Sequence, residues 1–137
     1  MQMTKLKNIL SKRKSNFNHY KKLFHQNQFF TYLDSKRKKF VNSYYCFTII
    51  LKKKKKGLRD LITKKLKSSG IGCSVYYPGP VPLLSFYKKK YELKNKAFPN
   101  AVSISNHSIS LPVGPHINKE TIEIIYNNLI KIISKLK

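Results

Sequence analysis

Acidic residues are scarce in this sequence. Its 137 residues include 5 Asp and Glu against 29 Lys and Arg, which gives a formal net charge of +24. Glu120 and Glu123 both fall at the start of a predicted helix, where carboxylates stabilise the positive end of the helix dipole. This placement favours a structural role for the pair over general acid–base catalysis.

Cysteines and long apolar runs are also few. Cys46 and Cys73 are too few for a disulfide scaffold and lack the spacing of metal ligands, so we expect both to be small buried hydrophobic residues. The longest apolar run, residues 44–51, is far shorter than the roughly 20 residues that span a bilayer. The first residues show no continuous apolar segment of the kind found in secretory signals. We therefore expect a soluble, cytoplasmic protein with no metal site and no membrane partner.

Arginine is rare among the basic residues. There are 26 lysines and three arginines, spread along the whole chain, whereas bidentate recognition of phosphate and guanine favours arginine. The hydrophobic fraction of 41% supplies enough apolar residues for a core and excludes a disordered basic tail. We interpret the charge mainly as a lysine-rich composition. A nucleic-acid contact at the five lysines 52–56 remains an alternative.

Hydrophobic periodicity predicts a single α+β domain over residues 1–137, in which helices cover a small sheet. The predicted elements are a leading helix over 4–25, a strand–helix–strand unit over 43–77, a proline-rich arm with loops over 78–116, and a C-terminal helix over 118–136.

The pattern also predicts details within these elements. The strands span 43–51 and 71–77 on either side of a helix that begins near Leu58, while residues 26–42 show no period and are expected to be irregular. All six prolines lie between Pro78 and Pro115, so the arm is expected to contain only short elements. These are a helix over 83–91, a helical turn at 99–100 and a strand over 108–113.

Several short motifs follow one another along the chain in a fixed order. They are R-x-x-N-x-x-x-Y (Arg13, Asn16, Tyr20), SYYCFT at 43–48, Arg59-Asp60, Gly70-Ile71-Gly72, Tyr77-Pro78, FPNA at 98–101 and SLPVGP at 110–115. Together they resemble the C-terminal portion of the DegT/DnrJ/EryC1/StrS aminotransferases, which are sugar aminotransferases dependent on pyridoxal phosphate. The resemblance implies the small C-terminal domain of the aspartate aminotransferase fold.

The resemblance also implies what this chain lacks. In the family, the Schiff-base lysine, the acid at the pyridine nitrogen and the phosphate cup belong to the large domain, and no lysine here resembles the Schiff-base motif. We therefore expect no catalytic residue, no cofactor-binding residue and no pyridoxal phosphate bound to this chain alone. By the same resemblance, Tyr76, Tyr77 and Pro78 are the residues expected near a substrate.

The preferred hypothesis is a C-terminal fragment of a nucleotide-sugar aminotransferase. Such an enzyme transfers an amino group to a keto-sugar nucleotide for polysaccharide or glycan synthesis, and the fragment would be inactive until it associates with a separate large domain. One alternative is a non-catalytic subunit that pairs with a full-length homologue. The other is the small basic nucleic-acid-binding protein.

Overall fold

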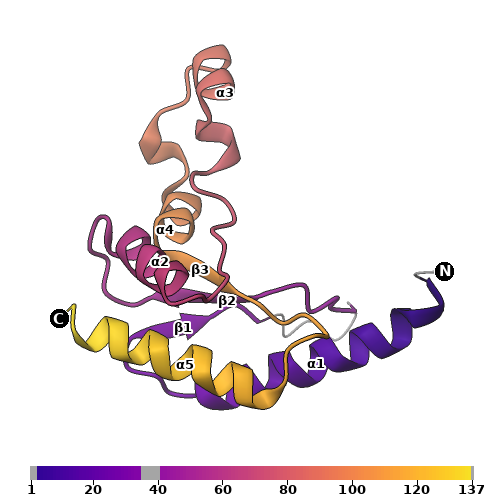
Figure 1. Cartoon of the computed structure of the whole chain (residues 1–137). Coiled ribbons are helices and arrows are strands. Elements are labelled where there is room, and N and C mark those ends of the chain that lie inside the picture. The colour runs from indigo at the N-terminus through magenta and orange to yellow at the C-terminus, as the bar shows by residue number, and fades with distance from the viewer. Residues whose placement is uncertain (1–2, 35–40, 137) are drawn as a thin grey trace.

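A three-stranded antiparallel sheet forms the centre of the protein, in a computed structural model that describes residues 3–34 and 41–136. Its strands are β1 (Phe30–Tyr32), β2 (Phe47–Leu51) and β3 (Ser108–Leu111), with β2 in the middle. In β2, Phe47, Ile49 and Leu51 are buried on one face. The sheet and its surrounding helices confirm the α+β prediction (Figure 1).

Two long helices lie beneath the sheet, α1 (Leu6–Leu23) and α5 (Lys119–Ser134), and α1 follows a 3-10 turn, η1 (Met3–Lys5) (Figure 1). Both were predicted from their apolar periodicity. Tyr20 on α1 is fully buried and stacks on Phe47 with ring centroids 4.9 Å apart. Asn118 caps α5 as its side-chain oxygen accepts a 2.9 Å hydrogen bond from the backbone N–H of Thr121. Aromatic packing therefore fixes α1 against the centre of the sheet.

The other two helices of the body are α2 (Leu58–Ser68) and α4 (Pro99–His107). α2 packs against α5, β3 and α4, and α4 lies above the sheet on the side away from α1 (Figure 1). The buried guanidinium of Arg59 donates to the Asp60 carboxylate at 2.7 Å and to the backbone carbonyl of Ser105. Arg59 thus joins α2 to α4.

The segment between these helices projects from the body as an arm (Figure 1). It contains the 3-10 turns η2 (Val81–Leu83) and η3 (Asn95–Ala97) and the short helix α3 (Ser85–Lys90). A helix lies within the predicted range 83–91, but α3 is shorter than predicted because Leu84 is extended (φ −62°, ψ 144°) and separates it from η2. At 99–100 the expected single turn is instead the nine-residue α4, because Pro99 suits the first position of a helix and does not interrupt it.

The predicted strands were wrong in the residues at which they begin and end. The backbone of Tyr44 has a left-handed conformation with φ 49°, which a strand does not accommodate. The predicted strand over 43–51 therefore begins only at Phe47. β3 stops at Leu111 because Pro112 has no N–H to continue the ladder. Within the predicted strand over 71–77, only Ser74 pairs, in an isolated bridge to Ser110. The apolar alternation there reflects burial of Ile71 and Cys73 under the helices rather than strand pairing.

A short strand also lies where irregular structure was expected. β1 falls inside 26–42, and its Phe30 pairs with Leu51 of β2. Three residues are too short to give a detectable period. Positions 35–40 of that stretch lie outside the described residues. Over the described parts of the chain, no helix combines the length and the apolarity needed to cross a membrane.

Candidate functional site

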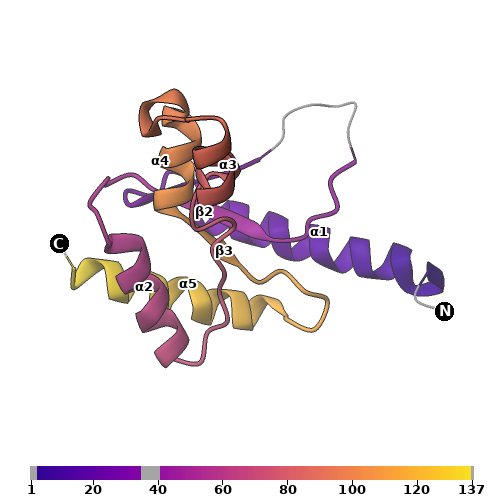
Figure 2. The ribbon, with the colours of Figure 1, turned by 90° about the horizontal axis from the view of Figure 1, so that it is seen from above.

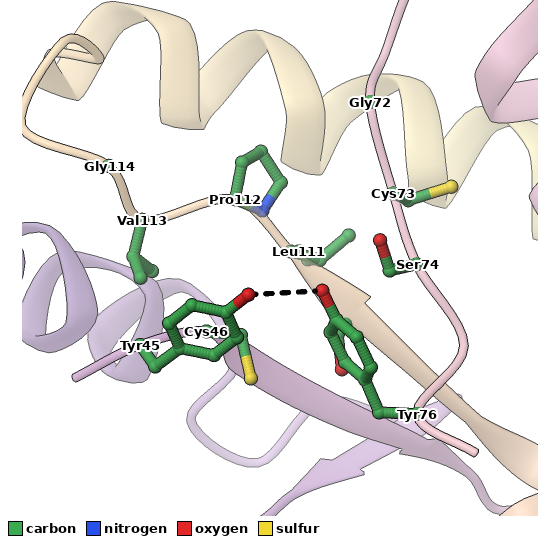
Figure 3. A pocket seen from close by; sticks show the side chains of 11 residues that line it. Tyr45, Cys46, Gly72, Cys73, Ser74, Tyr76, Leu111, Pro112, Val113 and Gly114 are labelled. Atoms are coloured by element: carbon green, nitrogen blue, oxygen red, sulfur yellow. Dashed lines mark hydrogen bonds between the residues drawn. The ribbon is translucent and has the colours of Figure 1, made fainter. Parts of the chain in front are cut away.

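A hollow of about 370 Å³ opens where three segments distant in sequence meet (Figure 3). The first segment precedes β2, the second follows α2, and the third is the end of β3 together with the loop after it. The lining residues are Tyr45, Cys46, Gly72, Cys73, Ser74, Tyr76, Ser110, Leu111, Pro112, Val113 and Gly114. Three of the motifs noted in the sequence, SYYCFT, Gly-Ile-Gly and SLPVGP, therefore converge on one place.

Two tyrosines face each other across this hollow. The hydroxyls of Tyr45 and Tyr76 lie 3.4 Å apart, and their rings are tilted at 50° with centroids 6.1 Å apart (Figure 3). The hydrogen bond with Tyr45, and then that with Ser74, lowers the pKa of Tyr76. The same bond to Tyr76 raises the pKa of Tyr45. Both side chains are exposed, 63% and 45%, so their hydroxyls can exchange this mutual bond for bonds to a polar ligand.

Hydroxyl groups on the strands hold the base of the hollow in place. Thr48 and Ser110 place their hydroxyl oxygens 2.9 Å apart across β2 and β3. The Sγ atom of Cys46 lies 3.4 Å from the Thr48 hydroxyl. The backbones of Ser74 and Ser110 exchange hydrogen bonds of 3.0 and 2.8 Å. The segment that carries Tyr76 is thereby fixed to the edge of the sheet.

The loop after β3 forms another wall and is tied to α1. Asn16 is buried, and its Nδ2 donates to the backbone carbonyls of Gly114 and Ile117, both at 3.1 Å. A Cβ atom on Gly114 would clash with the His116 imidazole, so glycine suits this position. Asn16 belongs to the R-x-x-N-x-x-x-Y motif, whose Tyr20 packs in the core and has its pKa raised by burial. Two residues of that motif thus act in positioning and packing.

Both cysteines line the hollow, and both are free thiols. Cys73 is buried as expected, and burial raises the pKa of its thiol. Its Sγ points toward the Thr63 carbonyl at 3.9 Å, whereas Cys46 is only half-buried and faces Thr48. The two thiols therefore contact different residues. Within the described ranges, no group of three metal-ligating side chains comes together.

The structure separates the three residues that were expected near a substrate. Tyr76 lines the hollow, whereas Tyr77, which is 65% exposed, and Pro78 continue toward the arm outside the lining. Their proximity to a substrate stays a prediction. Sequence reasoning missed Tyr45 and Ser110, although both belong to quoted motifs, because only long-range pairing brings them to Tyr76.

The lysines at 52–56 lie away from this hollow, in the connection between β2 and α2. Their side chains are exposed, but the ammonium of Lys52 donates a 2.7 Å hydrogen bond to the Asn27 carbonyl. The five lysines therefore do not form a uniform strip, and a nucleic-acid contact there stays a prediction.

The same fold is present as one part of solved sugar aminotransferases. A Streptococcus pneumoniae putative sugar aminotransferase, Spr1654, in its PMP-form superposes with a TM-score of 0.88 at 23% identity, over 99% of this chain and 33% of that chain. Helicobacter pylori PseC, an aminotransferase involved in the biosynthesis of pseudoaminic acid, gives a TM-score of 0.83 at 23% identity. This superposition covers 98% of this chain and 35% of that chain. This chain thus spans about a third of the length of these neighbours.

The family model of the DegT/DnrJ/EryC1/StrS aminotransferase family matches residues 1–130, and the chain belongs to that family. Methanocaldococcus jannaschii protein MJ1066 is 34% identical over 77 residues, which are 56% of this chain and 20% of that protein. The erythromycin biosynthesis sensory transduction protein EryC1 of Saccharopolyspora erythraea is 36% identical over 62 residues, which are 45% of this chain and 17% of that protein. The chain therefore covers about a fifth of these curated relatives.

The hollow does not fit pyridoxal phosphate, the cofactor of the family and of the structural neighbours. Among the residues that the structure describes, its lining has no lysine amine to bond the aldehyde, no carboxylate for the pyridine nitrogen and no cationic side chain for the phosphate. The residues can present hydroxyls, thiols, backbone groups and tyrosine rings. No step of amino transfer is therefore assigned to them.

Proposed function

We propose that this chain acts as the C-terminal small domain of a nucleotide-sugar aminotransferase dependent on pyridoxal phosphate. The reaction would move an amino group onto a keto-sugar nucleotide and supply an amino sugar for a polysaccharide or glycan. One observation carries the proposal: 99% of the chain superposes on a third of a sugar aminotransferase.

The proposal divides the work between two parts of the enzyme. Tyr45 and Tyr76 would offer hydroxyls and flat rings to the sugar, with Tyr77 and Pro78 beside them. The lysine, acid and phosphate cup would come from a large domain. On its own this chain would bind no cofactor and transfer no amino group. The two unpaired cysteines support action in the cytoplasm.

The test is to purify the tagged chain from its native cell and identify what accompanies it. The proposal expects a large domain of this family, in the same polypeptide or as a second chain, together with the visible absorbance of bound pyridoxal phosphate. Amino transfer should require both parts. Tyr76→Phe should raise KM for the sugar nucleotide, with Tyr87→Phe on the arm as the matched control.

Two outcomes would count against the proposal. A full-length aminotransferase bound to this chain at a fixed ratio, active without it, would favour the non-catalytic subunit. A chain that purifies alone, with no cofactor and no gain of activity from any large domain of the family, would refute it.

A further inference from the structure

A second hollow lies away from the tyrosine pair, between the C-terminal halves of α2 and α5, two helices that contact each other where α2 crosses α5 (Figure 2). Its volume is about 280 Å³, room for several water-sized groups at about 30 Å³ each. The lining residues are Lys65, Ser68, Ser69, Asn128, Lys131, Ile132 and Lys135. Nothing in the proposed amino transfer uses this place.

The charged side chains that line this hollow, among the residues that the structure describes, are all lysines. Lys65 comes from α2, Lys131 from α5 and Lys135 from the residue that ends α5, and no carboxylate of the described residues lines the hollow. Among the residues that the structure describes, none of these three ammoniums forms an ion pair. Like charges gathered in one concave place repel one another, and a bound anion would relieve that repulsion.

The usual structural reason for lysines at a helix end applies weakly to α2. Its last carbonyls already have partners: the N–H of Gly70 donates to Lys67, and the N–H of Ile71 donates to Leu66. Gly70 adopts the left-handed conformation that this ending requires. These carbonyls therefore do not need the Lys65 ammonium as a hydrogen-bond donor, and the ammonium is available to bind an anion.

Hydroxyl donors stand beside the ammoniums. Ser68 and Ser69 both donate their hydroxyls to the Lys65 carbonyl at 3.0 Å, and the N–H of Ser69 is shared between this oxygen at 3.2 Å and the Leu66 carbonyl at 3.0 Å. A carbonyl has two lone pairs, so three donors are more than it holds well. One hydroxyl can turn toward an anion while the carbonyl stays satisfied.

We propose that this hollow, the α2–α5 lysine site, binds a phosphate-bearing anion with two or more negative charges. Three ammoniums and a hydroxyl match the several oxygens of such a group, and exposure lets it enter from solvent. The inference is independent of the proposed aminotransferase function.

The test measures binding of inorganic pyrophosphate to the full 137-residue chain by isothermal titration calorimetry at physiological ionic strength. We expect saturable binding with one anion per chain. The triple variant K65Q/K131Q/K135Q should bind at least about tenfold more weakly, because three nearby charges are lost together. The single variant Lys131→Glu, which reverses one charge on an exposed helix face, should also weaken binding.

The matched control is K54Q/K55Q/K56Q, which removes the same three charges from an exposed loop outside the hollow. It should change the affinity by no more than about twofold, since distant exposed charges are screened by salt. Far-UV circular dichroism verifies that every variant stays folded.

Separate titrations with a nucleoside diphosphate show which part of a ligand is recognised. Equal affinity for pyrophosphate and the nucleotide supports a site for phosphate alone, and tighter nucleotide binding that is lost in K65Q/K131Q/K135Q supports a nucleotide at the same site. Binding that never saturates, or an equal loss in the two triple variants, would overturn the site and leave only the attraction of the overall charge.

Discussion

Replacing Asn16 by Ala tests how the wall of the tyrosine-lined hollow is held. The side chain is 6% exposed and donates two hydrogen bonds of 3.1 Å to the carbonyls of Gly114 and Ile117. These bonds connect α1 to a loop about 100 residues further along the chain. The variant removes both donors and leaves both carbonyls without them.

The expected cost follows from those two bonds. Each contributes about 1 kcal/mol, so Asn16→Ala should lower the free energy of unfolding by about 2 kcal/mol. For a chain of this length, that loss lowers Tm by about 7 °C. Urea titration and thermal melting, both followed by far-UV circular dichroism, measure the two quantities.

A matched control lies two residues further along the same helix, on a different face. Asn18 is exposed, so Asn18→Ala should change the free energy of unfolding by no more than about 0.5 kcal/mol. Asn16→Asp keeps the shape but has no N–H to donate, and it should cost at least as much as Asn16→Ala. Equal stability of the Asn16→Ala and Asn18→Ala variants would refute the reasoning.

Three further predictions concern the same region. Tyr45→Phe removes the partner whose hydrogen bond lowers the pKa of Tyr76, so an NMR titration should find that pKa raised; an unchanged value would contradict the pairing. Phe47→Ala should cost about 3–5 kcal/mol in urea unfolding because the ring is fully buried, and a loss below about 1 kcal/mol would contradict its place in the core. Gly114→Ala should cost no more than about 1 kcal/mol, because the exposed His116 ring that the new Cβ would meet can turn away into solvent, and a loss above about 2 kcal/mol would contradict this.

The elements that sequence predicted well are those with long periodic patterns. α5 shows an apolar stripe with a capping Asn118, and α1 shows a similar stripe along 18 residues. β1 has three residues and no period, so only its pairing with Leu51 on β2 defines it. Local sequence therefore decides the helices here, whereas the edge of the sheet depends on contacts made after the chain has folded.

The candidate site was predictable to a smaller extent. Tyr76 was selected because it precedes a proline-rich segment within a family motif. Tyr45 stands 31 residues earlier, and its role appears only when β2 and the Ser74 bridge bring the two hydroxyls together. Asn16 was noted as part of a motif, but its two carbonyl partners lie on a loop near the other end of the chain. Contacts between residues so far apart cannot be predicted from their spacing along the sequence.

The distribution of charge now separates two properties of this protein. The chain carries +24, yet none of the residues that line the tyrosine hollow is charged. An uncharged hollow can orient a sugar through hydroxyls and rings. It cannot neutralise a phosphate, and it supplies no carboxylate for proton transfer. For the proposed reaction, the surface lysines would raise the local concentration of an anionic nucleotide sugar, an effect that salt weakens. Attraction of the substrate and chemistry on it must therefore come from different groups, and the groups for chemistry lie outside this hollow.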